Sequence, residues 1–184
     1  TTLITPDKKD STSHGGWQAT VLHKQDKVWG GANTFGIQYG VGPGTGAGGQ
    51  CCDRMGTTGS IRNGSDVTRL RIFNSLWIQP TPEWSAEMVA IVQRDKSNVS
   101  GGSSTWTTVG VRPVYAVNDN FKLQFELGTD RVTSPTGGAA QRLTKLTFAP
   151  TLTAGKGYWS RPELRALVTY GKWNDAATAA VNKA

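Results

Sequence analysis

The sequence predicts an all-β protein, an antiparallel up-and-down transmembrane β-barrel. Three observations carry this prediction. Eight segments alternate apolar and polar residues, which is the periodicity of strands with two different faces. Most of these segments reach the length of about ten residues that a tilted strand needs to cross a bilayer. The chain has no run of about 18 apolar residues, so the sequence offers no candidate transmembrane helix.

The predicted strands cover residues 16–25, 32–41, 68–78, 84–94, 105–117, 120–132, 142–153 and 160–173. The sixth is the clearest, because Phe121, Leu123, Phe125 and Leu127 alternate with polar residues or glycine. The fourth, WSAEMVAIVQR, alternates poorly. The Ala-rich tail 175–184 lacks an apolar stripe, and we expect it to be a loop.

The connections between the predicted strands alternate in length. Short turns are expected near 27–31, 79–83, 118–119 and 154–158, and long loops near 42–67, 95–104 and 133–141. Short turns at one end and long loops at the other are typical of outer-membrane barrels. Soluble β-sandwiches also alternate apolar and polar residues, so a soluble β domain stays the alternative. The up-and-down order favours the membrane barrel, as do aromatic residues near strand ends: Trp17, Trp84, Trp106, Tyr115, Trp159 and Trp173.

Several other functions find little support in the sequence. The net charge is 20 − 13 = +7, but the basic residues are scattered, so we predict no nucleic-acid partner. Cys51 and Cys52 are adjacent and have no further ligands near them, so neither a metal site nor a cofactor is predicted. The glycine-rich run 44–49 lacks the helix that a dinucleotide site needs. The carboxylates expected on the polar sides of the strands show no spacing that indicates a catalytic pair, so we do not expect an enzyme.

The last predicted strand suggests sugar binding. Proteins bind sugars by stacking aromatic rings on the C–H faces and placing charged hydrogen-bond partners beside them. Strand parity puts Trp159 on the same side as Arg161, Glu163 and Arg165, so we expect these four residues to form a sugar contact, with an interfacial anchor as the alternative role of Trp159. Further polar candidates for a water-filled lumen are Arg112, Lys122 and Glu126, and weaker aromatic candidates are Phe73 and Trp77.

Four runs resemble the C-terminal half of the maltoporin family, the sugar-specific porins: TTVGVRPVY at 107–115, KLTFAP at 145–150, YWSRPELR at 158–165 and TYGKW at 169–173. The resemblance implies an 18-stranded barrel, of which this chain holds eight strands, in a homotrimer in the outer membrane of Gram-negative bacteria. It implies facilitated diffusion of maltodextrins or related oligosaccharides along an aromatic slide in the lumen. Trp159 falls on one slide position near the periplasmic end.

The chain departs from the family at two points. The next slide position falls on Ala32, which has no ring, so maltodextrin specificity is open. Residues 1–184 are expected to be the C-terminal part of a single porin barrel domain, without the N-terminal half and the final strand. The expected partners are oligosaccharide substrates, outer-membrane lipid, lipopolysaccharide and two further copies of the protein. The alternatives are a soluble β-rich carbohydrate-binding module and a general diffusion porin without sugar specificity.

Overall fold

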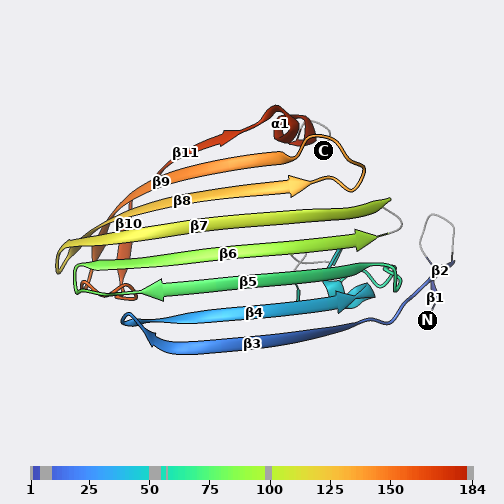
Figure 1. Cartoon of the computed structure of the whole chain (residues 1–184), viewed down its shortest axis with the longest axis horizontal. Coiled ribbons are helices and arrows are strands. Elements are labelled where there is room, and N and C mark those ends of the chain that lie inside the picture. The colour runs from blue at the N-terminus through green and yellow to red at the C-terminus, as the bar shows by residue number, and fades with distance from the viewer. Residues whose placement is uncertain (1, 5–9, 50–54, 57, 98–100, 182–184) are drawn as a thin grey trace.

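The protein folds mainly as one large antiparallel sheet, in which successive strands are neighbours (Figure 1). The computed structural model describes residues 2–4, 10–49, 55–56, 58–97 and 101–181. The sheet runs from β3 to β9 in chain order, and β10 and β11 both pair with β9. Its strands are β3 (Trp17–Val28), β4 (Gly31–Val41), β5 (Thr68–Ile78), β6 (Trp84–Ser97), β7 (Gly102–Asn118), β8 (Phe121–Thr133), β9 (Gln141–Thr153), β10 (Glu163–Arg165) and β11 (Val168–Trp173).

Three smaller features complete the described part of the chain. The short strands β1 (Thr2–Ile4) and β2 (Asp10–Thr12) form a separate hairpin. The 3-10 helix η1 (Gly42–Thr45) follows β4, and the helix α1 (Asp175–Val181) follows β11. No helix among the residues described here has both the length and the apolar character needed to cross a bilayer.

The up-and-down antiparallel architecture confirms the predicted fold class, with an open sheet in this chain. Among the described strands, β3 pairs only with β4, while β10 and β11 pair only with β9. Backbone N–H and C=O groups cannot stay unpaired in the hydrocarbon of a membrane, because each costs several kcal/mol. These two edges are therefore where a sheet in lipid would continue into further strands.

The sheet has two chemically different faces. Glu87, Arg112 and Glu126 lie on one side of β6, β7 and β8, which we call the polar face. On the opposite, apolar face, Phe125 and Phe148 meet with ring centroids 4.9 Å apart. Many large apolar side chains on that face are exposed: Val21, Phe35, Ile37, Leu70, Ile72, Val92, Val109, Leu127, Leu146, Leu152, Leu164 and Val168. A continuous exposed apolar surface of this extent is expected to contact another apolar phase.

Aromatic pairs border the apolar face near both strand ends. Trp17 packs on Tyr39 with centroids 5.6 Å apart, and Trp84 packs on Tyr115 at 4.9 Å. Such rings suit the headgroup level of a bilayer. Trp106 is different: its Nε1 donates a 3.0 Å hydrogen bond to Asp130, and its register partner is Val132 on the polar-face side. Its assignment to an interfacial belt was therefore wrong.

The fourth predicted strand is regular despite its poor alternation. Strand β6 pairs without interruption with β5 and β7. The irregular pattern arises because Val89 and Ile91, on the same side as Glu87, are apolar, while Met88 and Ala90 occupy the other face. Apolar residues on both sides of one strand erase the two-residue period without changing the backbone.

The last predicted strand, 160–173, differs from the structure in two ways. It begins only at Glu163 and is interrupted between Arg165 and Val168, although both halves keep the same register against β9. The interruption lies opposite Pro150. The Ala166 amide donates to the Pro150 carbonyl at 3.1 Å, but proline has no N–H to return the bond.

The Ala-rich tail is helical over Asp175–Val181, so the expectation of a loop was wrong there. Asn174 explains the helix start, because its side-chain oxygen accepts a 3.1 Å hydrogen bond from the Ala177 amide. Asp175 adds a negative charge to the first turn, and alanine has the highest helix propensity. This capping signal was present in the sequence and was not weighed.

Candidate functional site

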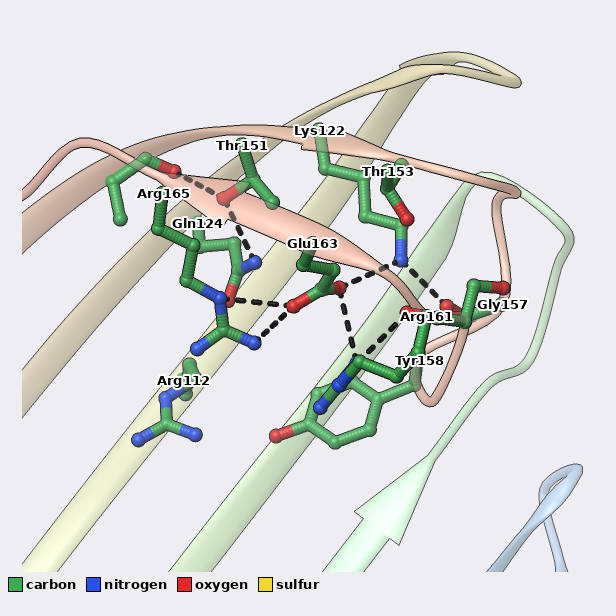
Figure 2. A network of polar contacts seen from close by, with 12 residues as sticks. Arg112, Lys122, Gln124, Thr151, Thr153, Gly157, Tyr158, Arg161, Glu163 and Arg165 are labelled. Carbon is green, nitrogen blue, oxygen red and sulfur yellow. Dashed lines mark hydrogen bonds and ion pairs between the residues drawn. The ribbon is translucent and has the colours of Figure 1, made fainter.

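The connection between β9 and β10, residues 154–162, folds against the polar face instead of forming a tight turn (Figure 2). The Tyr158 amide donates to Gln79 Oε1 at 3.0 Å, and its hydroxyl donates to Glu87 Oε2 at 2.6 Å. Lys156 forms an ion pair with Glu83 at 3.3 Å. Three contacts therefore fasten this connection to the end of β5 and the start of β6.

Three aromatic rings meet where this connection reaches the sheet. Trp77 on β5 stacks on Tyr158 with centroids 6.2 Å apart and an angle of 19° between the planes. Trp159 meets both rings edge-on, at 6.0 Å from Trp77 and 4.9 Å from Tyr158. Trp159 keeps 55% of its surface exposed, so it is the most exposed ring of this cluster.

Glu163, at the start of β10, is surrounded by three cations. Lys122 Nζ lies 3.3 Å and Arg161 Nη1 lies 3.2 Å from Glu163 Oε1, while Arg165 Nε donates to Oε2 at 2.9 Å. The side chains of Lys122 and Glu163 are only 1% and 4% exposed. Lys122 also donates to the Gly157 carbonyl at 2.6 Å, so this buried ion pair holds the connection as well. Figure 2 shows Lys122, Arg161 and Arg165 converging on the Glu163 carboxylate.

A second charged cluster crosses the polar face from β6 to β9. Arg112 donates to Glu126 Oε2 at 2.6 Å and to Glu87 Oε2 at 3.3 Å, and Lys145 lies 3.1 Å from Glu126 Oε1. Because Glu87 also accepts from Tyr158, this cluster is connected to the aromatic rings. Opposite charges on adjacent strands attract one another and stabilise the sheet. The remaining polar atoms of these side chains lie on the polar face.

The phenol of Tyr158 acts as a hydrogen-bond donor under ordinary conditions. Burial, and after it the neighbouring Glu87 carboxylate, raise the pKa of Tyr158 to about 12. The hydroxyl therefore stays protonated near neutral pH. It can hold Glu87 in place without adding a charge of its own.

The structure brings most of the predicted site residues together, but not for the predicted reason. Trp159 and Arg161 belong to the connection and not to a strand, so the parity that was used to place them does not apply. They reach the polar face through the contacts to Trp77 and Glu163. Phe73 lies apart from them. Its ring covers Gly36 so closely that an added Cβ would clash with it, so Phe73 packs on the neighbouring strand.

Sequence reasoning missed four residues of this region. Tyr158 and Glu87 were not considered as candidates, nor was Lys145. Trp106 was counted only among the aromatic residues near strand ends, although its parity with Arg112 on the same predicted strand indicated the polar face. Cys51 and Cys52 lie outside the described residues. Within the described ones, no three histidine, cysteine or carboxylate side chains are grouped to hold a metal ion.

A sequence model of the LamB porin family matches residues 2–184, nearly the whole chain. The chain belongs to the LamB porin family. Members of this family are channels of the Gram-negative outer membrane and pass sugars, which agrees with an up-and-down sheet that has one exposed apolar face and one polar face. Family membership selects the membrane barrel over the soluble β domain. The apolar face of this porin then corresponds to the lipid side and the polar face to the lumen.

Proposed function

We propose that the protein is a sugar-selective outer-membrane porin in which Trp159 forms part of an aromatic path for oligosaccharides. The observation that carries the proposal is the exposed Trp159 ring beside Trp77 and Tyr158, flanked by the Glu163 and Glu126 clusters. An aromatic face with charged hydrogen-bond partners next to it matches the apolar and hydroxyl surfaces of a sugar.

Trp77 gives this path a second ring. Ala32, where the family resemblance leads us to expect an aromatic residue, is the direct register partner of Trp77 on β5. The two residues therefore occupy the same level of the sheet and share its polar side. In our proposal Trp77 supplies from β5 the aromatic surface that Ala32 lacks on β4, so the path continues from Trp159 toward β4. The sugars would be maltodextrins or related oligosaccharides.

In this proposal residues 1–184 form the C-terminal portion of one porin barrel domain, and the porin functions as a homotrimer in contact with outer-membrane lipid and lipopolysaccharide. The two open sheet edges support the assignment to a larger barrel, because strands in lipid need partners on both sides. The charged residues Arg112, Lys122, Glu126, Arg161, Glu163 and Arg165 would bind sugar hydroxyls or hold the groups that do so.

The test is conductance of the protein, expressed from its full coding sequence, in planar lipid bilayers. We expect an ion current that linear oligosaccharides block reversibly, with block increasing with chain length because more rings contact the path. A current that no oligosaccharide reduces would contradict sugar selectivity and leave a general diffusion porin. A water-soluble protein without channel activity would contradict the proposal as a whole.

A further inference from the structure

The polar face holds a cavity whose charged lining is mainly cationic. It has a volume of about 270 Å³ and lies over β7, β8, β9 and the junction of β10 with β11. The charged side chains that line it are Arg112, Lys145 and Arg165 against the single carboxylate of Glu126. Three cations facing one anion leave a local surplus of positive charge.

This surplus is not removed by the neighbouring carboxylates. Glu163, which Arg165 contacts, already has Lys122 at 3.3 Å and Arg161 at 3.2 Å on its other oxygen. Its negative charge is therefore balanced without Arg165. Glu126 is likewise shared between Arg112 and Lys145, and Glu87 takes a 3.3 Å contact from Arg112. The three carboxylates in and beside the cavity thus face five cations, which leaves a net positive charge: Arg112, Lys122, Lys145, Arg161 and Arg165 against Glu87, Glu126 and Glu163.

Hydrogen-bond donors also remain available at the cavity. The bonds of Arg165 to Glu163 use Nε and Nη2, and among the described residues its Nη1 has no acceptor. Lys145 has one ion-pair partner in that part of the chain, Glu126, and its side chain is 47% exposed. The hydroxyls of Thr147 and Thr169, 2.9 Å apart, line the same cavity; one donates to the other, which leaves one O–H to donate to an incoming oxygen.

We propose that this cavity binds the carboxylate of an acidic oligosaccharide, so that the porin prefers sugars with uronic-acid units. The planar guanidinium of Arg165 and the flexible ammonium of Lys145 suit a carboxylate between them. Arg112 connects this cavity through Glu87 to Tyr158 and the Trp159 ring. The inference rests on the proposed function, because it assumes that the neutral part of the sugar lies along the aromatic path.

The experiment compares block of the channel current by trigalacturonate and by maltotriose, a neutral sugar of the same length. We expect trigalacturonate to block at a roughly tenfold lower concentration, the value of about one charge-assisted hydrogen bond. Lys145→Gln should abolish most of this advantage, read as the ratio of the blocking concentrations of the two sugars, so that any shared loss of neutral-sugar binding cancels. Arg165→Gln should lower the same ratio, and Arg165→Lys, which keeps the charge, should restore part of it.

The matched control is Lys172→Gln, which removes the same charge from β11 at an exposed position whose register partner is Thr144 on the apolar-face side. It should leave both sugars unaffected. Maltotriose block equal to or stronger than trigalacturonate block would overturn the acidic substrate and leave the sugar porin intact. Failure of both sugars to block would overturn the inference together with the proposed function.

Reversal potentials in a salt gradient give a readout without sugar. Lys145→Gln should lower the anion selectivity of the channel, and an unchanged reversal potential would count against the site.

Discussion

The Tyr158 hydroxyl donates a 2.6 Å hydrogen bond to Glu87 although 71 residues separate the two in the chain. Tyr158 belongs to the connection between β9 and β10, and Glu87 belongs to β6. The bond therefore ties one end of the described sheet to its middle, across the polar face. It also joins the aromatic cluster to the charged cluster, because Glu87 Oε2 accepts from Arg112 as well.

Tyr158→Phe should loosen the connection without unfolding the sheet. The change removes a hydrogen bond to a charged acceptor and keeps the ring that stacks on Trp77. We expect the docking of residues 154–162 to weaken by about 1.5–3 kcal/mol, which is typical of a hydrogen bond to a charged group. Hydrogen–deuterium exchange should show faster exchange in this connection, and single-channel records should show more current noise.

Tyr170→Phe is the matched control for this change. Tyr170 lies on β11, is exposed, and has Leu146 as its register partner on the apolar-face side. The exchange rates of residues 154–162 should not respond to it. Equal effects of the two substitutions, or no effect of Tyr158→Phe, would show that the hydroxyl does not hold the connection.

Alkaline pH should release the same connection. The pKa of Tyr158 is raised to about 12, chiefly by burial, against about 10 for tyrosine in an unfolded chain. A raised pKa means that the stabilisation is complete below pH of about 10 and is lost as pH rises toward 12. Absorbance at the phenolate band should show one tyrosine that loses its proton only toward pH of about 12. The Glu87→Gln substitution should lower the pKa of that tyrosine. A Tyr158 that titrates at the ordinary tyrosine value of about 10 would contradict this.

Much of the sheet could be predicted from the sequence, because the alternation of apolar and polar residues along a strand shows which side chains share a face. The run from Phe121 to Leu127 places Lys122 and Glu126 on one side without any tertiary information. The path of residues 154–162 could not be predicted in this way. It depends on contacts from Tyr158 and Lys122 to distant groups, and no local periodicity encodes such contacts.

Two errors had a signal in the sequence that could have corrected them. Trp106 was placed by its nearness to a strand end, although its parity with Arg112 puts it on the polar face. The helix after β11 was missed because residues 175–184 were judged by their lack of an apolar stripe, and the capping residue before them was not considered. Asn174 followed by Asp175 is a recognisable helix start. The deciding signals were the alternation of side chains along a strand for Trp106 and the capping residue for the helix.

Lys122→Met should destabilise the porin more than the loss of a surface lysine. Lys122 is 1% exposed, and its ammonium bonds both Glu163 and the Gly157 carbonyl. Removing it leaves that carbonyl without its donor and Glu163 with only its two arginines, at a cost of about 2 kcal/mol. Guanidinium unfolding followed by tryptophan fluorescence should show a lower midpoint. Lys24→Met, at an exposed site on β3, should leave the midpoint unchanged, and equal midpoints for both variants would contradict a structural role for Lys122.

Trp159→Ala should weaken sugar block while preserving the channel. Its ring is 55% exposed and lies nearly perpendicular to Trp77 and Tyr158, and the stacking of Tyr158 on Trp77 does not involve Trp159, so its removal leaves that contact in place. Loss of one aromatic stacking surface corresponds to about 1 kcal/mol, or about a fivefold higher blocking concentration. Trp84→Ala is the control, because Trp84 is similarly exposed but packs on Tyr115 at the apolar face. Unchanged open-channel conductance with weaker block only in Trp159→Ala would place this ring on the sugar path, and equal block in both variants would remove it from that path.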